Sequence, residues 1–160
     1  MRKAVLALSV TAAGCAAAVA VPDNLKPGAD ESLALIVPAK GVQIYECRDA
    51  QWAFVAPDAE LFDRAGRKIG THYAGPHWEA ADGSKIVGAV KARADAPAAG
   101  NIPWLLLGTK SVGRDGAFSK VSSIQRVTTT GGVAPEGSCA QPAARVRVPY
   151  TADYYFFTTK

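Results

Sequence analysis

The stretch His77–Val90 (HWEAADGSKIVGAV) indicates the fold of this chain more clearly than any other. Residues 77–80 and 85–90 both have the β-branched or aromatic content of short strands. Between them lies Asp82-Gly83, a pair typical of a type I′ turn, because both central residues of that turn need a positive φ angle. The stretch therefore predicts an antiparallel β-hairpin.

The same pattern of short apolar runs between turn residues continues on both sides of this hairpin. The runs before it are 33–37, 42–47, 51–56, 59–62 and 67–73, and those after it are 102–108, 121–127, 145–148 and 154–159. The run 102–108 is apolar throughout, which is typical of a strand buried on both faces. Long loops are expected over 92–101 and 128–139. The sequence thus predicts an all-β fold, a β-sandwich or barrel of about ten short strands.

Length and composition indicate one domain. The chain has 160 residues, of which 49% are hydrophobic and 20% charged, as expected for a protein that folds around a core. The net charge of +4 falls to +2 without Arg2 and Lys3, and no run of basic residues is present, which argues against a nucleic-acid binder. We expect residues 33–160 to form a single all-β domain and residues 21–32, with their Pro and Gly, to form a linker.

Residues 1–20 are typical of a signal peptide. Arg2 and Lys3 precede an apolar run over 4–13 that is too short to span a bilayer. Residues 18–20 (AVA) fit ordinary signal peptidase, which would release a periplasmic or extracellular protein. Residues 12–15 (AAGC) instead resemble a lipobox, in which Cys15 would be lipidated and would anchor the protein to a membrane. A retained N-terminal helix in a cytosolic protein is the third interpretation.

The cysteines support export. On either cleavage route Cys15 is unavailable for pairing inside the domain, which leaves Cys47 and Cys139. An even pair in an exported chain is most simply a disulfide. This disulfide would close a loop of about 90 residues, and the chain-entropy description values such a loop at about 4–5 kcal/mol. Two unpaired buried thiols are the alternative.

Both histidines lie in the segment His72–Glu79, and two kinds of chemistry fit them. His72 could act as a general acid or base, with Glu79 or Asp82 orienting its ring. Alternatively, His72, His77 and a carboxylate could bind a metal ion, since His77 and Glu79 share one face of a strand.

The same segment also fits a binding surface. Tyr73, Trp78 and Trp104 could form an aromatic platform for a sugar or another flat ligand, with Glu79 and Asp82 accepting hydrogen bonds from hydroxyl groups. A purely structural role is the alternative, in which the aromatic rings pack under a tight turn and His72 satisfies a buried carbonyl.

Two adjacent residues further along the chain are also candidates for ligand binding. Gln125 and Arg126 point to opposite faces of a strand, so one of them could face a pocket. The motifs of common hydrolases, zinc proteases, thiol oxidoreductases and nucleotide-binding proteins are missing from the sequence. No cofactor is therefore expected.

Several motifs together resemble a known family. They are Gly41-x-Gln43-x-Tyr45-x-Cys47, residues 69–79 (IGTHYAGPHWE), Asp82-Gly83-Ser84, residues 102–106 (IPWLL), Ile124-Gln125-Arg126, Thr130-Gly131-Gly132 and Cys139. Over residues 33–157 the chain resembles domain-of-unknown-function family 3455, which comprises exported proteins of bacteria and fungi. The resemblance implies no established activity. A small polar residue is usual in that family at the position of His77, so a metal site is the least favoured interpretation and none is predicted.

The sequence therefore favours an exported, disulfide-bonded β-domain that binds a small molecule or a glycan. One alternative is a hydrolase or lyase that uses His72 with Glu79 or Asp82. The other is a structural or interaction protein of the cell envelope.

Overall fold

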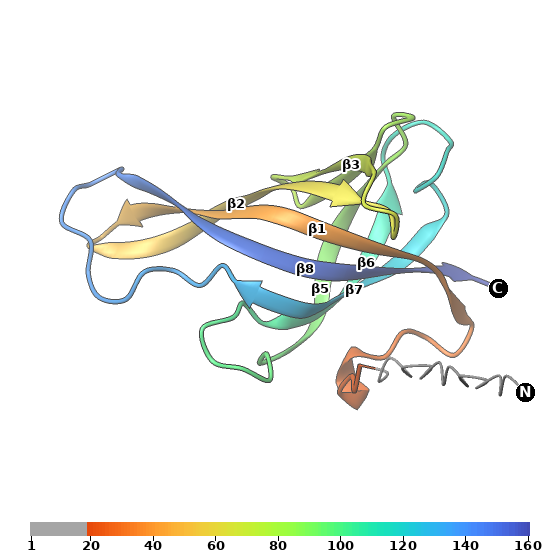
Figure 1. Cartoon of the computed structure of the whole chain (residues 1–160), viewed down its shortest axis with the longest axis horizontal. Coiled ribbons are helices and arrows are strands. Elements are labelled where there is room, and N and C mark those ends of the chain that lie inside the picture. The colour runs from red at the N-terminus through yellow and green to blue at the C-terminus, as the bar shows by residue number, and fades with distance from the viewer. Residues whose placement is uncertain (1–18) are drawn as a thin grey trace, which may run out of the picture.

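The computed structural model describes residues 19–160 and shows a closed barrel of antiparallel strands (Figure 1). In chain order the elements are the 3-10 helix η1 (Asp23–Leu25) and the strands β1 (Glu31–Arg48), β2 (Gln51–Phe62), β3 (Lys68–Tyr73), β4 (His77–Ala80), β5 (Lys85–Ala94), β6 (Trp104–Ser111), β7 (Val121–Gly131) and β8 (Arg145–Thr159). Each strand pairs with the next one along the chain. The barrel closes between β1 and β8, where Glu31 lies opposite Thr159. The predicted all-β fold is confirmed, and it is the barrel form.

Eight strands are present in residues 19–160, where the sequence suggests about ten. Pro38 and Pro57 come directly after the predicted runs 33–37 and 51–56, yet both lie inside strands. Pro38 pairs with Asp153 of β8, and the pairing of β1 with β2 begins only at Ala39. Pro57 precedes Ala59, where the pairing of β2 with β3 begins. Each proline therefore has one unpaired strand edge beside it, where a missing N–H donor is tolerated.

The hairpin predicted from His77–Val90 is present as β4 and β5. The N–H of Gly83 donates to the carbonyl of Ala80 at 2.9 Å and closes the turn. Gly83 has a φ of +84°, whereas the φ of Asp82 is not positive. The prediction of a type I′ turn here was therefore wrong, because a single left-handed glycine completes this turn. A type I′ turn joins β1 to β2 instead, where Asp49-Ala50 has φ angles of 51° and 59°.

The interior of the barrel is filled with apolar side chains at the end that holds the two termini of the domain. Leu61, Ile86, Phe118, Ile124 and Phe156 are each at most 1% exposed in this interior cluster. Phe118 comes from the loop between β6 and β7 and packs edge-to-face on Phe156, with ring centroids 4.9 Å apart. This end of the barrel is therefore closed by a packed core.

A second apolar cluster lies on the outer face of β6 and β7, under the N-terminal segment. Leu25 of η1 is fully buried there against Trp104, Leu106 and Val127. The side chain of Gln125 donates from Nε2 to the carbonyl of Leu25 at 2.6 Å. The segment 21–32, for which the sequence predicts a linker, is thus docked on the barrel at this point.

This outer cluster explains the continuous apolar run in β6. Leu105 and Leu107 pack inside the barrel, whereas Trp104 and Leu106 lie under the N-terminal segment. The strand is therefore buried on both faces, as the run of apolar residues predicts.

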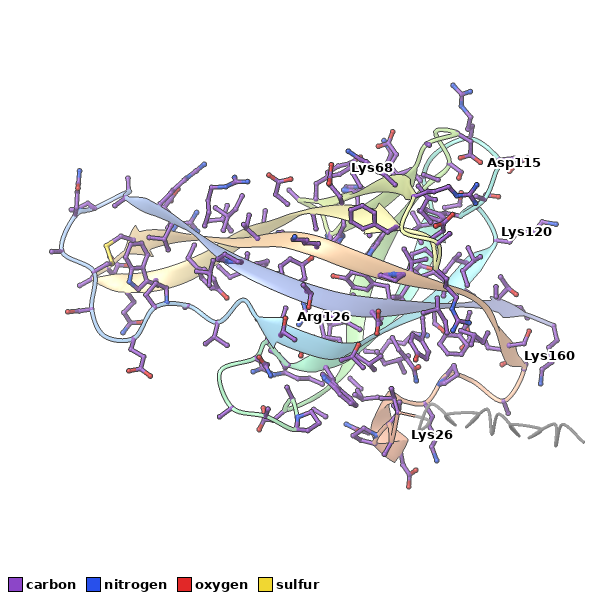
Figure 2. All side chains as sticks on the ribbon, in the orientation of Figure 1. Lys26, Lys68, Asp115, Lys120, Arg126 and Lys160 are labelled. Atoms are coloured by element: carbon purple, nitrogen blue, oxygen red, sulfur yellow. A yellow bond between two sulfur atoms is a disulfide. The ribbon has the colours of Figure 1, made fainter. Side chains whose placement is uncertain are left out.

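The strands β1, β2 and β8 extend beyond the rest of the barrel, and a disulfide fastens their far end (Figures 1 and 2). It joins Cys47, near the end of β1, to Cys139 in the loop between β7 and β8, with a Cα–Cα distance of 5.8 Å. The N–H of Cys139 also donates to the carbonyl of Ala50 at 3.0 Å. The pairing expected from the cysteine count is present in the structure.

The predicted signal peptide lies almost wholly outside the described residues, and Cys15 with it. Within residues 19–160, no helix has the length and apolar character that crossing a membrane requires.

A candidate ligand cavity inside the barrel

The half of the barrel away from the start of β1 and the end of β8 is hollow. It contains a cavity of about 370 Å³, which falls in the range of about 300–1,000 Å³ typical of small-molecule sites. A wider space of about 850 Å³ adjoins it under the loop between β5 and β6. The two spaces share Gln43, Phe54, Val90, Leu105 and Arg126 in their walls. The inner cavity therefore opens to solvent through this wider mouth.

The wall of the inner cavity is largely apolar. Its apolar side chains include Phe54, Val55, Pro57, Val90, Leu105 and Leu107. Polar side chains enter it from four strands: Gln43 from β1, His72 from β3, Arg126 from β7 and Tyr154 from β8. Alternation of side chains along each strand places these groups inside and their chain neighbours outside.

Arg126 brings a positive charge into this apolar space. Its Nε and Nη2 donate to the carbonyl of Pro103 at 3.1 and 2.8 Å, so the loop between β5 and β6 holds the guanidinium in place. None of the ion pairs within residues 19–160 includes Arg126. Because a guanidinium stays charged in proteins, the cavity holds a cation without a carboxylate partner from the described chain.

Two tyrosines lie beside Arg126. Tyr154 is 1% exposed, and its hydroxyl is 3.2 Å from that of Tyr150. Burial raises the pKa of Tyr154, and the positive charge of Arg126 only partly opposes this rise. Burial also raises the pKa of Tyr150. Both hydroxyl groups therefore keep their protons at neutral pH and can donate hydrogen bonds.

Two further donors in the cavity wall have no hydrogen-bond partner in the described part of the chain. They are Nε2 of Gln43 and Nε1 of Trp78, and these residues are 3% and 1% exposed. A buried donor without a partner costs about 1–3 kcal/mol. Such groups in a native protein are commonly satisfied by a bound molecule or by water.

His72 is a neutral group in this site. Its Nδ1 donates to the carbonyl of His77 at 2.8 Å, which leaves the lone pair on Nε2. The ring stacks on Trp78 with centroids 4.1 Å apart. Burial lowers the pKa of His72 to about 3. The ring is therefore an uncharged hydrogen-bond acceptor near neutral pH and a weak base.

Three other residues of the segment His72–Glu79 lie on the outer face of the barrel. The hydroxyl of Tyr73 donates to Oε2 of Glu79 at 2.5 Å, and Nζ of Lys85 is 3.7 Å from the same oxygen. The hydrogen bond to Glu79 is the main cause that raises the pKa of Tyr73 to about 12. His77 stacks on Tyr73 on this outer side, so the wall of the barrel separates His77 from His72. No three His, Cys, Asp or Glu side chains within residues 19–160 are grouped to hold a metal ion.

Asp82 lies at the packed end of the barrel, far from the cavity. It accepts hydrogen bonds from the N–H and hydroxyl of Ser84, at 2.8 and 2.6 Å, and from the N–H of Ala117 at 2.8 Å. These bonds lower the pKa of Asp82 to about 2. Asp82 thus ties two loops together, and neither it nor Glu79 is placed to orient the ring of His72.

Residues 27–158 match the family described as protein of unknown function (DUF3455). The chain belongs to the DUF3455 family. The match covers the barrel from before β1 almost to the end of β8, and the family description assigns no activity. Comparisons with curated proteins and with solved structures give no significant match.

This DUF3455 barrel brings together only part of the residue set predicted from the sequence. Trp78, Arg126 and His72 line the cavity, whereas Gln125 lies under η1 and bonds to Leu25. Tyr73 likewise lies outside the cavity, on the outer face of the wall.

Sequence reasoning missed Gln43 and Tyr154 as cavity residues of the DUF3455 barrel. Alternation offered a signal for Gln43. It shares a strand face with Tyr45 and Cys47, both of which are buried, so a polar side chain on an otherwise inward face could have been singled out. Tyr154 has no such signal, because it stands in a wholly aromatic run.

Proposed function

We propose that this DUF3455 protein is an exported binding protein that holds a small, largely apolar molecule inside its barrel. The observation that carries the proposal is the cavity of about 370 Å³ with Gln43 and Trp78 in its wall. Both side chains present buried donors without a partner in the described chain. An apolar wall with a few converging polar groups is the usual composition of a small-molecule site.

The wall composition favours an apolar molecule over a glycan. Sugar sites usually offer an open aromatic face together with hydrogen-bond partners for many hydroxyl groups. Trp78 is only 1% exposed, and Trp104 is buried in the outer cluster, so neither provides an open platform. The polar groups of the cavity are few and are surrounded by aliphatic and aromatic side chains.

The position of His72 favours binding over acid-base catalysis. A catalytic histidine near neutral pH usually has a pKa close to that pH and a group that orients its ring toward a substrate. Burial lowers the pKa of His72 to about 3, and its Nδ1 bonds to a backbone carbonyl. No ion pair within residues 19–160 joins His72 to a carboxylate.

Two observations support the proposed location outside the cytoplasm. The disulfide between Cys47 and Cys139 belongs to an oxidising compartment in most organisms. Residues 1–20 have the pattern of a signal peptide.

Thermal unfolding with a panel of small apolar alcohols and acids tests the binding proposal. A molecule that binds only the native state at 100 times its Kd stabilises it by about 2.7 kcal/mol. For a chain of this length we expect the midpoint to rise by about 5–10 °C. Leu105→Trp fills the cavity from its wall and should abolish the rise. Val112→Trp places the same ring at an exposed position at the packed end and should leave the rise unchanged.

A second variant tests the same site in case Leu105→Trp does not fold. Val90 is 58% exposed and lines both the cavity and its mouth, so Val90→Trp should narrow the entrance without disturbing the core. Weaker binding in this variant supports a site inside the barrel. Unchanged binding in both folded variants, or no midpoint rise with any compound, would overturn the proposal.

A further inference from the structure

We propose that the ligand of this cavity carries a single carboxylate, and that Arg126 binds that carboxylate in the middle of the barrel. The inference rests on the proposed binding function and adds the chemical class of the ligand. It is carried by the placement of Arg126, by the absence of any Asp or Glu from the wall of the inner cavity, and by the surplus of hydrogen-bond donors around it.

The charge of Arg126 is not balanced by the described chain. Asp95 lines the adjoining mouth but forms no ion pair with Arg126, and Asp153 of β8 accepts a hydrogen bond from the hydroxyl of Thr128. Two acidic side chains of β1 and β2 are paired with arginines on the outer face. Asp58 of β2 binds Arg147 at 2.6 Å, and Glu46 of β1 binds Arg48 and Arg145 at 2.9 and 2.7 Å. Removing a charged group from water costs free energy unless an opposite charge or hydrogen bonds compensate. An anionic ligand group would supply the missing charge.

The other polar groups near Arg126 also suit an anion. Nε2 of Gln43 and Nε1 of Trp78 are donors without partners in residues 19–160. The hydroxyl of Tyr154 keeps its proton because burial raises its pKa. The exception is His72, which is neutral. Its Nδ1 donates to the carbonyl of His77, so its Nε2 can only accept a hydrogen bond. A cationic ligand would meet the like charge of Arg126 and no carboxylate in the wall of the inner cavity.

The guanidinium is held before any ligand arrives. Both Nε and Nη2 donate to the carbonyl of Pro103, which fixes the plane of the group. A fixed guanidinium loses little side-chain entropy on binding, and its fork geometry matches a carboxylate. One arginine balances one negative charge, which favours a carboxylate over a phosphate group, whose charge at neutral pH approaches two.

The apolar side chains shared by the cavity and its mouth indicate where the apolar part of the ligand would lie. Phe54, Val90 and Leu105 line both the inner cavity and the mouth, together with Arg126. A carboxylate at Arg126 would therefore leave the body of the molecule against these three side chains, directed toward the mouth. This arrangement fits a small amphiphilic acid with one polar end.

Isothermal titration with three matched compounds at neutral pH tests the inference. Decanoate, decanol and decylamine have the same apolar chain and carry a negative, a neutral and a positive head. A hydrogen bond to a charged group is worth enough that decanoate should bind about 10–100 times more tightly than decanol. Decylamine should bind more weakly than decanol.

Three variants test whether Arg126 causes the preference for decanoate over decanol. Arg126→Gln should reduce the ratio of decanoate to decanol affinity to about one, because it removes the charge and keeps a polar side chain. Arg126→Lys should retain part of the ratio, because it keeps the charge and loses the fork. Arg147→Gln makes the same change in net charge on the outer face, where Arg147 pairs with Asp58, and should leave the ratio unchanged.

The outcomes separate the inference from the proposed function. Equal binding of decanoate and decanol to the unaltered protein, or an unchanged ratio in a folded Arg126→Gln variant, would overturn the carboxylate and leave the binding function standing. Failure of all three compounds to bind would overturn the inference, and the absence of a midpoint rise with every compound of the thermal panel would overturn the proposed function as well. A loss of preference in Arg147→Gln as large as in Arg126→Gln would show that only the overall charge matters, and would also overturn the inference.

Discussion

Replacing Leu25 with alanine is expected to lower the free energy of unfolding by about 3 kcal/mol. Leu25 is fully buried against Trp104, Leu106 and Val127 on the outer face of the barrel. Leu→Ala changes at fully buried sites cost about 2–5 kcal/mol, and the lower half of this range applies where the surroundings can partly collapse. The N-terminal segment crosses the surface and can move toward the barrel, so we expect a value in that lower half.

Urea and thermal unfolding measure this change. In a chain of 160 residues, about 3 kcal/mol corresponds to a fall of about 6–12 °C in the midpoint. Leu33→Ala is the matched control, because Leu33 is 48% exposed on β1. Its cost should stay below about 1 kcal/mol.

A small effect would refute the docking of the N-terminal segment. If Leu25→Ala costs no more than Leu33→Ala, then Leu25 does not contribute to a packed cluster in solution. Hydrogen exchange gives an independent check, since undocking would also release the bond from Gln125 to the carbonyl of Leu25.

Three further predictions follow from groups away from the cavity or buried in its wall. Replacing both Cys47 and Cys139 with alanine should lower the free energy of unfolding by about 4–5 kcal/mol in urea, since the bond spans a sequence separation of 92; an unchanged midpoint would contradict this. Asp82→Asn should destabilise the protein at neutral pH. Hydrogen bonds lower the pKa of Asp82 from 3.8 to about 2, so its stabilising effect is complete above pH 3.8 and is lost toward pH 2. The difference from the unaltered protein should therefore shrink over that interval in acid unfolding curves. The imidazole resonances of His72 should not titrate on lowering the pH from 6.5 until it approaches 3, because burial lowers its pKa to about 3. The unfolded chain binds a proton over that interval, so His72 should make the native state less stable as the pH falls. A midpoint near 6.5 in the NMR titration would disprove the burial of His72.

Local sequence patterns predict the individual strands well, but they do not predict that the sheet closes into a barrel. The hairpin around Asp82-Gly83 depends on adjacent residues, so its sequence is enough to reveal it. The pairing of Glu31 with Thr159 joins the two ends of the domain, and no local pattern encodes it. Pro38 and Pro57 look like strand ends until the pairing shows that each has an unpaired edge beside it.

The side of the barrel that a residue faces is also hard to predict where both faces are buried. Gln125 and Arg126 alternate, and each shares its face with an apolar residue, Val127 or Ile124. The outer face of β7 is apolar because Leu25, a hundred residues earlier in the chain, covers it. The alternation of side chains along a strand places Gln125 and Arg126 on opposite faces, but it cannot show which of them faces inward. The charged residue proves to face the interior.

The closure of β1 on β8 decides how the barrel is oriented when something is attached to its C-terminus. The N–H of Lys160 donates to the carbonyl of Asp30 at 2.8 Å, so β1 begins where β8 ends (Figure 1). That place lies at the packed end, whereas the mouth is lined by the far parts of β1 and β5 and by the loop between β5 and β6. A tag or a second domain joined to the C-terminus would therefore hold the barrel with its entrance facing away from the attachment. The N-terminal segment instead runs back along the outside of the barrel, where Val21 packs on the same outer cluster as Ala94 and Ala96, beside the mouth.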